Sequence, residues 1–387
     1  MVDKSKCVGC MACVSVCPTK ALYIDKDQEG FNYPILLQNM CINCNACKRV
    51  CPVLEIDEKK EEAMYYAMKS KNFNIQINSA SGGVFPEIAQ WILRDDGIVW
   101  GAKFDSNFDV RHDYVVSENE LPLLCRSKYV QSDMTNVYES IRRQLRNGKK
   151  VLFSGTPCQT TALAKFVGSE LKSNLYLVDI ICHGVPSPGI WQEYLDELCK
   201  QKCRRKEDII QICFKYKNNT EKTWLHPGFY VKWKDGTEYI DFSANTWYEK
   251  GFLGNLYVRP SCHKCKFKSL RSTSDITIGD FWGCKELYPD FLDINGVSLV
   301  IIKTKKGEFM KNKIIDNMNS ILISKDEASK YNSRLIEPSQ KNLKRKKFWK
   351  KYNGLDRNMN DMDKLVKKLT YLSLYDRIRN KILRLLK

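Results

Sequence analysis

The spacing of apolar residues divides most of the chain after residue 62 into alternating strands and helices. Short β-rich runs predict strands at 63–69, 98–104, 151–154 and 175–181. Apolar residues at steps of three and four predict helices at 84–93, 137–146 and 190–199, and a further helix is expected after Pro157. Because strands and helices alternate, this part of the chain is expected to form an α/β domain with a mixed sheet.

The pattern changes further along the chain. Residues 209–242 are mostly β-like, and Asp235-Gly236 is typical of a hairpin turn. The last β run is expected at 275–278. A helix face is predicted near the C-terminal end, where apolar residues again recur at steps of three and four. These residues are Leu365, Leu369, Leu372, Tyr375, Ile378, Ile382 and Leu385.

Charge separates this last segment from the rest of the chain. The net charge is +18, and residues 341–387 supply +12 of it with 16 Lys or Arg against four Asp. Because the positive charge is concentrated in this one segment, it argues against a general nucleic-acid surface. It favours a basic helical tail that attaches to anionic lipid or to a partner subunit. The alternative is a terminal helix packed on its own domain, with its charged face in water.

Cysteine spacing characterises the first 55 residues. Two copies of C-x2-C-x2-C-x3-C-P, offset by 34 residues, end at Pro18 and Pro52. This is the spacing of bacterial ferredoxins with two [4Fe–4S] clusters, in which the fourth cysteine of each copy ligates the other cluster. One predicted ligand set is Cys7, Cys10, Cys13 and Cys51, and the other is Cys41, Cys44, Cys47 and Cys17. The alternatives are zinc, which prefers paired knuckles with longer separations, and disulfides, which suit short secreted chains.

Three regions follow from these patterns. Residues 1–55 are predicted to be an α+β ferredoxin-like domain, 63–340 a larger α/β domain and 341–387 the tail, with a charged linker at 55–62. No signal sequence precedes Cys7, and no apolar run approaches the ~20 residues that span a bilayer. We therefore expect a cytoplasmic protein, with attachment at the inner membrane face as one role of the tail.

Four cysteines of the large domain stand where a cluster or cofactor could bind. Cys158 and Cys182 each follow a predicted strand, and open α/β sheets bind cofactors at the carboxyl ends of their strands. The helix that begins near Pro157 is expected to lower the pKa of Cys158. Cys262 and Cys265 form a C-x2-C pair, so together the four could hold a third [4Fe–4S] cluster.

Other interpretations of these cysteines remain open. A lone cysteine after a strand is more often a core residue, and a lone C-x2-C pair binds zinc as readily as an iron–sulfur cluster. Asp280 could replace a thiolate or contact a cofactor, although a buried turn aspartate is commoner. The remaining cysteines are interpreted as structural; they are Cys125, Cys199, Cys203, Cys213 and Cys284.

Two loops of the large domain could contact a phosphate or flavin. Residues 78–84, Asn-Ser-Ala-Ser-Gly-Gly-Val, lead into a predicted helix whose free N–H groups suit an anion, with an ordinary helix cap as the alternative. Residues 126–129, Arg-Ser-Lys-Tyr, add two cations. No G-x-G-x-x-G or P-loop motif is present, which argues against the usual dinucleotide fold and against a nucleoside triphosphatase.

These motifs, in this order, resemble the coenzyme F420 hydrogenase/dehydrogenase beta-subunit family in its versions with a two-cluster ferredoxin domain. Beside the ferredoxin motif, the resemblance rests on 79–83, 127–129, 155–159, 182–186, Cys262 with Cys265, and 274–280. It covers about residues 1–300, and the residues after Pro289 fit poorly. The resemblance implies a third [4Fe–4S] cluster and a bound FAD. The residues then expected to contact FAD are Ser79, Ser81, Gly82, Gly83, Ser127, Lys128, Thr156 and Gln159.

A flavin also fits the chemistry, because clusters pass single electrons whereas a hydride or a reduced double bond needs two. The sequence thus predicts an iron–sulfur flavoprotein oxidoreductase that joins ferredoxin-type clusters to a coenzyme F420-type or other reducible substrate. His183 is a candidate proton donor, with simple hydrogen bonding as the alternative. The alternative function is an electron-transfer subunit without its own substrate, docked on a partner enzyme or membrane complex. A redox protein or small-molecule donor is expected as partner, and nucleic acid is not.

Overall fold

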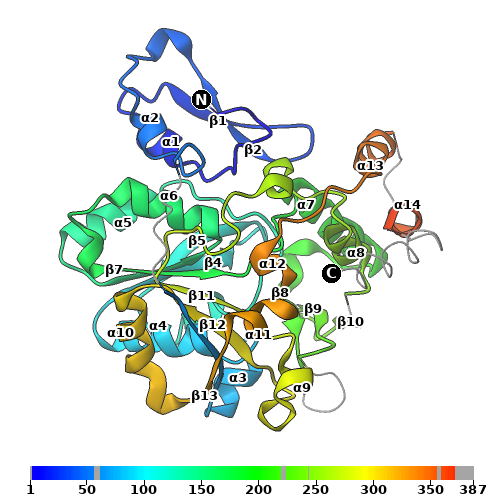
Figure 1. Cartoon of the computed structure of the whole chain (residues 1–387). Helices are drawn as coiled ribbons and strands as arrows, with labels where there is room; N and C mark the ends of the chain where they lie inside the picture. Colours follow the sequence, from blue (N-terminus) through cyan, green and yellow to red (C-terminus); the bar gives the residue numbers. More distant parts are fainter. Residues whose placement is uncertain (1, 56–61, 219–223, 243, 355–358, 371–387) are drawn as a thin grey trace.

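The computed structural model describes residues 2–55, 62–218, 224–242, 244–354 and 359–370. In Figure 1 a small N-terminal domain lies against one side of a larger α/β domain. No helix in these ranges is long and apolar enough to cross a membrane.

The small domain repeats one backbone conformation in its two cysteine loops. Gly9 and Met11 have positive φ angles of 69° and 60°, and Asn43 and Asn45, 34 residues later, have 53° and 56°. A short helix follows each loop, and an antiparallel hairpin lies between the loops. The elements are α1 (Ala12–Ser15), β1 (Leu22–Lys26), β2 (Asn32–Leu36), η1 (Gln38–Met40) and α2 (Ala46–Arg49). The sequence duplication is therefore also a structural one.

The large domain is built on an eight-stranded mixed sheet. In spatial order its strands are β13 (Met318–Ile323), β3 (Met64–Ser70), β12 (Ser298–Ile302), β11 (Ile276–Asp280), β7 (Leu175–Ile180), β6 (Val151–Gly155), β4 (Ile98–Phe104) and β5 (Val110–Val115). The four strands β4, β6, β7 and β11 are parallel, and the outer pairs are antiparallel. The expected mixed α/β architecture is thus confirmed.

Helices cover both faces of this sheet (Figure 1). One face carries α5 (Val137–Arg146) and α6 (Pro157–Val167), and the other carries α4 (Val84–Arg94) and α10 (Lys305–Ile314). Alternate residues of a strand point to opposite faces, so Val151 and Phe153 pack under α5 and α6 while Leu152 packs under α4. The small domain rests on the first of these layers, through α1.

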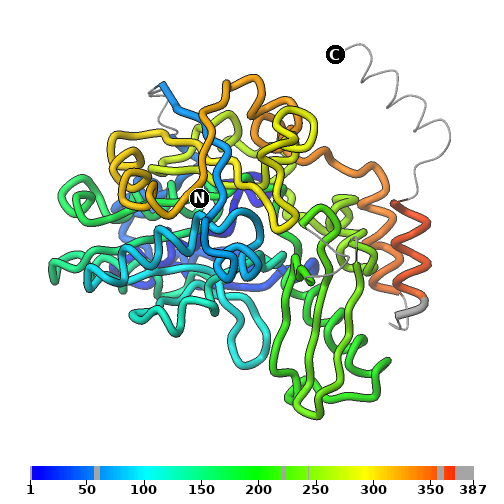
Figure 2. The backbone as a smooth tube through the Cα atoms, turned by 90° about the horizontal axis from the view of Figure 1, so that it is seen from below, coloured from blue at the N-terminus to red at the C-terminus, as the bar shows by residue number. Residues whose placement is uncertain are grey.

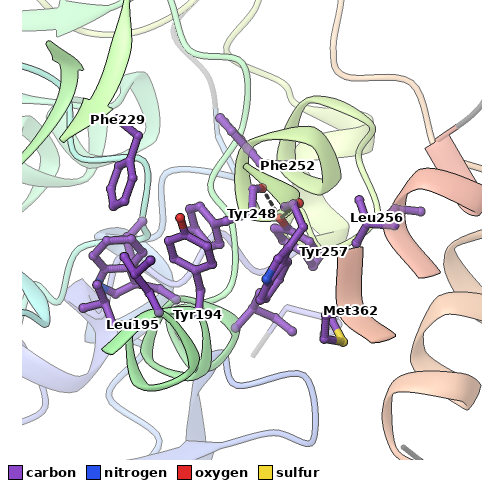
Figure 3. Packing of buried hydrophobic residues seen from close by; sticks show 14 of the residues in the cluster. Tyr194, Leu195, Phe229, Tyr248, Phe252, Leu256, Tyr257 and Met362 are labelled. Carbon is purple, nitrogen blue, oxygen red and sulfur yellow. Dashed lines mark hydrogen bonds between the residues drawn. The ribbon is translucent and has the colours of Figure 1, made fainter. Parts of the chain in front are cut away.

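A second, three-stranded antiparallel sheet extends beside the main body (Figure 2). It consists of β8 (Ile209–Tyr216), β9 (Gly228–Trp233) and β10 (Glu238–Phe242), with the expected Asp235-Gly236 turn between the last two. It packs on α7 (Pro188–Gln201) and α8 (Trp247–Leu253) through an aromatic core (Figure 3) that includes Tyr194, Phe229 and Tyr248.

The described part of the basic tail belongs to this aromatic core. Helices α13 (Arg345–Tyr352) and α14 (Met359–Thr370) pack on it, with Phe348, Met362 and Val366 buried (Figure 3). Leu365 and Leu369 are also buried, so their part of the predicted apolar face is covered by the protein itself. The other five predicted positions of that face, Leu372, Tyr375, Ile378, Ile382 and Leu385, lie outside the described residues, as do 56–61 of the expected linker.

The expectation that 275–278 is the last β run is wrong, because β12 and β13 follow it. Every residue of β12 is buried, and after Ser298 its sequence is a continuous apolar run without an alternating period. Around β3, β12 and β13, the sheet packs on α9, α11 and α12. The remaining short elements are α3 (Phe73–Ile77), η2 (Leu121–Leu123), η3 (Lys172–Asn174), η4 (Lys206–Asp208), η5 (Pro260–Lys264), α9 (Cys284–Leu287), η6 (Pro289–Phe291), η7 (Ile315–Asn317), α11 (Lys325–Lys330) and α12 (Ser333–Ile336).

Candidate functional site

Five cysteines of the small domain line one cavity of about 140 Å³. Four of them are Cys7, Cys10, Cys13 and Cys51, the ligands predicted for one cluster, and Cys51 comes from the other copy of the motif. The fifth is Cys47, which is predicted to bind the second cluster. Burial raises the pKa of Cys10 to about 12, and the neighbouring thiols of Cys7 and Cys51 add to this effect. Metal ligation requires thiolates, so iron would supply the positive charge that makes deprotonation favourable here. The cavity and the four sulfurs of the predicted set fit a [4Fe–4S] cluster.

A cluster differs from a single ion in the geometry it requires. Within the described ranges, no group of three or more His, Cys, Asp or Glu side chains is placed to hold a metal ion. A [4Fe–4S] cluster needs four thiolates around a volume rather than around a point. The four cysteines of the predicted set, which line one cavity, provide such a volume.

The second cysteine set lies nearer the surface. Cys44 is exposed, and Cys17, Cys41 and Cys47 are partly exposed. The loop from Cys41 to Cys47 repeats the conformation of the first loop, which supports the same chemistry for both. The arrangement of these four sulfurs around a second cluster stays a prediction.

Tyr138 of α5 links the small domain to the large one. Its hydroxyl donates a hydrogen bond to the carbonyl oxygen of Cys10 at 2.7 Å. Burial raises the pKa of Tyr138, and the thiols of Cys10 and Cys158 both contribute to the rise. The Tyr138 hydroxyl therefore lies close to the first cysteine set and also to a cysteine of the large domain.

The structure brings together the four predicted cluster cysteines of the large domain. Cys158 is in the first turn of α6, Cys182 follows β7, Cys262 is in η5 and Cys265 follows η5. Burial raises the pKa of Cys158, and the other three thiols raise it further. The expected lowering by the helix N-terminus therefore does not prevail, because burial outweighs it. The side chain of Thr156 lies beside this group, with Oγ1 3.2 Å from Cys158 Sγ.

A cavity of about 700 Å³ opens next to this cysteine group, and Cys182 forms part of its wall. It lies at the carboxyl ends of the parallel strands, with the N-terminal ends of α4 and α6 in its wall. Seven of the eight residues predicted to contact FAD line this cavity; they are Ser79, Ser81, Gly83, Ser127, Lys128, Thr156 and Gln159. His183, the candidate proton donor, lines it as well. Residues far apart in the sequence thus meet at one site.

Gly82 is the one predicted contact that does not line the cavity. Its N–H donates to Ser298 Oγ at 2.9 Å and its carbonyl accepts from Ser70 N at 2.7 Å. A Cβ at this position would lie 2.4 Å from the carbonyl oxygen of Met68. The glycine therefore allows the loop to lie directly on β3 and β12, while its neighbours face the cavity.

Several of the predicted side chains are already engaged by the protein. Ser81 Oγ donates to Val297 O at 2.9 Å, and Lys128 Nζ donates to the carbonyls of Leu123 and Cys125 at 2.9 and 2.6 Å. Burial lowers the pKa of Lys128 to about 8. The loops that carry Ser81 and Lys128 would therefore contact a ligand mainly through backbone N–H groups. These include the N–H groups that a helix leaves unpaired in its first turn.

An ion pair in the cavity wall was not predicted. Lys215 of β8 is buried and pairs with Asp280, whose other oxygen accepts from Trp224 Nε1 at 2.7 Å. Burial alone would lower the pKa of Lys215, but the Asp280 carboxylate raises it. Trp282 stacks on Trp224 at 5.3 Å between ring centroids, and its side chain remains 41% exposed in the wall. Asp280 thus binds Lys215 and an indole here; a role as a cluster ligand stays untested.

His183 lies in the wall with one ring nitrogen engaged. Nε2 is 2.9 Å from Asn255 Oδ1, and because a carbonyl oxygen only accepts, Nε2 carries the hydrogen. Burial lowers the pKa of His183 to about 4, so the ring is neutral near pH 7. A neutral ring with Nε2 occupied has only Nδ1 free for a ligand, and the proton-donor role stays a prediction.

Comparison with known proteins assigns two parts of the chain. Residues 6–67 match the 4Fe-4S dicluster domain, and residues 148–327 match the family described as the C terminus of the coenzyme F420 hydrogenase/dehydrogenase beta subunit. The second match continues past Pro289, so the expectation that the resemblance fades there is wrong. The loops 78–84 and 126–129 lie outside both matched ranges.

More distant likenesses add little. No curated protein matches the chain. One solved structure that matches is the xenon-derivatised F420-reducing [NiFe] hydrogenase complex from Methanosarcina barkeri, at 15% identity over 82% of this chain and 91% of that chain, with a TM-score of 0.45. The two family matches confirm the resemblance: residues 148–327, in the cavity-bearing domain, match the C terminus of the coenzyme F420 hydrogenase/dehydrogenase beta subunit, and residues 6–67, with the cysteine motifs, match the 4Fe-4S dicluster domain.

Proposed function

We propose that this chain is an iron–sulfur flavoprotein oxidoreductase that joins ferredoxin-type clusters to a two-electron substrate. One observation carries the proposal: the cysteine group of the large domain lies between the small domain and the large cavity. Tyr138 stands near both Cys10 and Cys158, and Cys182 of the same group forms part of the cavity wall. A relay from the dicluster domain to the cavity would therefore run through this cysteine group.

The cavity suits FAD in size and charge. Its volume of about 700 Å³ falls in the range of small-molecule sites. Four cationic side chains line it, Arg126, Lys128, Lys215 and Arg334, against the two carboxylates of Asp280 and Glu249. Two helix N-terminal ends add further positive potential, which favours an anionic group such as a pyrophosphate.

The residues of the wall would have distinct tasks. The N–H groups at the start of α4 would bind the pyrophosphate, and the exposed ring of Trp282 offers a flat surface for a planar ring. Bound FAD would exchange single electrons for pairs. The substrate would then be a compound that accepts or gives two electrons, of the coenzyme F420 type or another reducible organic molecule.

Cofactor analysis of the anaerobically purified chain tests this proposal. Three [4Fe–4S] clusters and one flavin predict about twelve irons and about one FAD per chain. Cys182→Ser should lower the iron content by about four and leave the dicluster signals intact. Cys203→Ser is the matched control, because Cys203 is exposed and lies outside the cysteine group. About eight irons and no flavin in the wild-type chain would refute the proposal.

A second function is favoured by the surface around the second cysteine set. Leu37, Met40 and Ile42 are exposed there, beside Cys41. Exposed apolar groups at a redox centre suit a partner protein, and the matched family is described as a beta subunit. In this case the chain would relay electrons without a substrate of its own. Turnover by the isolated chain, in a screen with coenzyme F420 and reduced dyes, would separate the two functions.

A further inference from the structure

Arg259 is a fully buried arginine at the boundary between the two domains. Its side chain has 0% exposure. It follows Val258, and its own N–H donates to Val185 O at 2.9 Å, so its backbone is fixed in the large domain. The N–H of Cys262 in turn donates to Arg259 O at 3.0 Å. The backbone of Arg259 is therefore part of the loop that carries the third cysteine group.

The guanidinium, by contrast, lies inside the small domain. Nε donates to the carbonyl oxygen of Cys7 at 2.8 Å, and Nη2 donates to Asn32 O at 3.0 Å. Nη2 also lies 3.9 Å from Cys7 Sγ. The group stands over the rings of Tyr33 and Phe31, at 4.1 and 5.2 Å from their centroids.

Two further residues make room for this guanidinium and hold it. Gln131 Oε1 accepts from Nη1 at 2.9 Å, while Gln131 Nε2 donates to Val8 O at 3.1 Å. Gly9 must lack a side chain, since a Cβ there would lie 2.5 Å from Nη1 of Arg259. The first cysteine loop is thus shaped around the arginine.

The charge of Arg259 lacks a conventional partner. Among the described residues, no carboxylate forms an ion pair with it, and its oxygen partners are neutral carbonyls and an amide. A buried charge is costly unless an opposite charge compensates it. The thiol that its guanidinium approaches directly is Cys7, at 3.9 Å, and this sulfur becomes anionic on metal binding. The thiol of Cys262 also lies within range of the Arg259 charge.

We propose that Arg259 is a positioning residue with two roles. It holds the ferredoxin domain against the large domain, and it raises the midpoint potential of the cluster bound by Cys7, Cys10, Cys13 and Cys51. An iron–sulfur cluster gains negative charge on reduction, and a buried cation nearby favours the reduced form. The second cysteine set lies nearer the surface and does not contact Arg259. The two clusters would therefore differ in potential. The inference needs only the dicluster domain, so it stands or falls separately from FAD binding.

Redox titration of the full-length, anaerobically reconstituted chain tests this role, with the reduced clusters followed by electron paramagnetic resonance. Two variants assign the signals: Cys41→Ala cannot complete the second cluster, and Cys182→Ser cannot complete the third. Arg259→Met should lower the midpoint potential of the first cluster and leave that of the second unchanged. Arg259→Lys keeps the charge and should give a smaller shift.

Arg345→Met is the matched control. Arg345 also joins the domains from a buried position, but its partner is the carboxylate of Glu29 and it contacts no cysteine. Its loss should leave both potentials unchanged. An Arg259→Met chain with wild-type potentials would overturn the inference, as would an equal shift in Arg345→Met. If the methionine variant loses its iron, the lysine variant decides: it must retain the cluster, and equal loss would overturn the electrostatic role.

Discussion

His112 shows how one buried imidazole organises the wall of the large cavity. Nε2 lies 3.0 Å from the carbonyl oxygen of Ser154, so Nε2 carries the hydrogen and Nδ1 accepts from Ser132 Oγ at 2.8 Å. Ser132 accepts from Gln159 Nε2 at 2.9 Å, and Gln159 Oε1 accepts from Thr156 N at 2.9 Å. Each of these polar atoms has a partner, and the bonds join three segments of the chain, so the wall is held in place up to Thr156.

Burial of His112 makes stability depend on pH. Burial lowers its pKa from 6.5 to about 4, so between these values the unfolded chain binds a proton that the folded chain excludes. Stability should therefore fall as pH decreases from 6.5 toward 4, by up to about 1.4 kcal/mol per pH unit. In denaturant titrations at pH 7.5 and 5.5, His112→Gln should lose less stability on acidification than the wild type. The exposed His226→Gln is the control, and an unchanged pH response in the His112 variant would contradict this account.

Thr156 should tune the third cysteine group. Its hydroxyl lies 3.2 Å from Cys158 Sγ and donates to Gln159 Oε1 at 2.9 Å. A thiolate ligand, being a charged acceptor, would attract this hydrogen to the sulfur, and such a hydrogen bond favours the reduced cluster. Thr156→Val should lower the midpoint potential of that cluster, whereas Thr156→Ser should preserve it. Because Thr156 also caps α6, the valine variant loses about 1 kcal/mol of stability as well.

Thr246→Val is the control that separates the effect of Thr156→Val on stability from its effect on the midpoint potential. Thr246 caps α8 by accepting from Glu249 N at 3.0 Å and contacts no cysteine, so its loss should reduce stability and leave the potential unchanged. The same potential in Thr156→Val as in the wild type would exclude a role for the hydroxyl.

Residues whose role is fixed by local spacing were predictable, and those that act over long sequence separations were not. Cys7 and Cys51 could be assigned to one cavity because the motif itself implies the exchange between its copies. Arg259 reaches Cys7 across 252 residues, and Lys215 reaches Asp280 across 65. Neither carries a motif, and an arginine or lysine in the sequence normally indicates an exposed position.

At the scale of elements, the same distinction holds. The sequence pattern predicts β4 (Ile98–Phe104) and α5 (Val137–Arg146) with the bounds that the structure has, because each is long and bounded by residues such as Gly97 and Asn147. It misses β13, an edge strand with only its first and last residues buried. The sequence could place the loops after β6 and β7 at one edge of the sheet, but not the second sheet beside it.

The loop before α4 depends on a close approach to the sheet. Gly82→Ala would place a Cβ 2.4 Å from Met68 O and 2.8 Å from Ser298 N, and backbone cannot yield as a side chain can. We expect a loss of about 1–3 kcal/mol in the free energy of unfolding, together with weaker retention of any flavin bound at the loop. Gly354→Ala is the control, because its nearest neighbours lie at an ordinary 3.8 Å. Wild-type stability in the Gly82 variant, measured by thermal unfolding, would contradict the contact.

At the scale of the whole molecule, the domains share their cores. Cys10, Ala12 and Val50 of the small domain pack in one cluster with α5 and α6, and Arg345 of the tail forms an ion pair with Glu29 of the small domain. The cysteine sets therefore have fixed relative positions. A relay of single electrons requires such fixed geometry, so the shared cores serve the proposed function as well as stability.

The tail separates into two parts that truncation should distinguish. Residues 345–370 bury Phe348, Met362 and Val366 in the aromatic core, and the loss of one such large side chain costs about 2–5 kcal/mol. Ending the chain at residue 340 removes all of these side chains together. The combined loss of free energy is as large as the typical total stability of about 5–15 kcal/mol, so this chain should not fold.

Ending the chain at Thr370 retains the whole of this core. That chain should keep the iron content and thermal stability of the full chain. If the residues beyond Thr370 attach the protein to anionic lipid, the shorter chain should also lose binding to vesicles of phosphatidylglycerol, while a full-length chain should bind them less at high salt. Folding and iron loading by the chain that ends at residue 340 would show instead that α13 and α14 are an appended element, and that their burial contributes little to the fold.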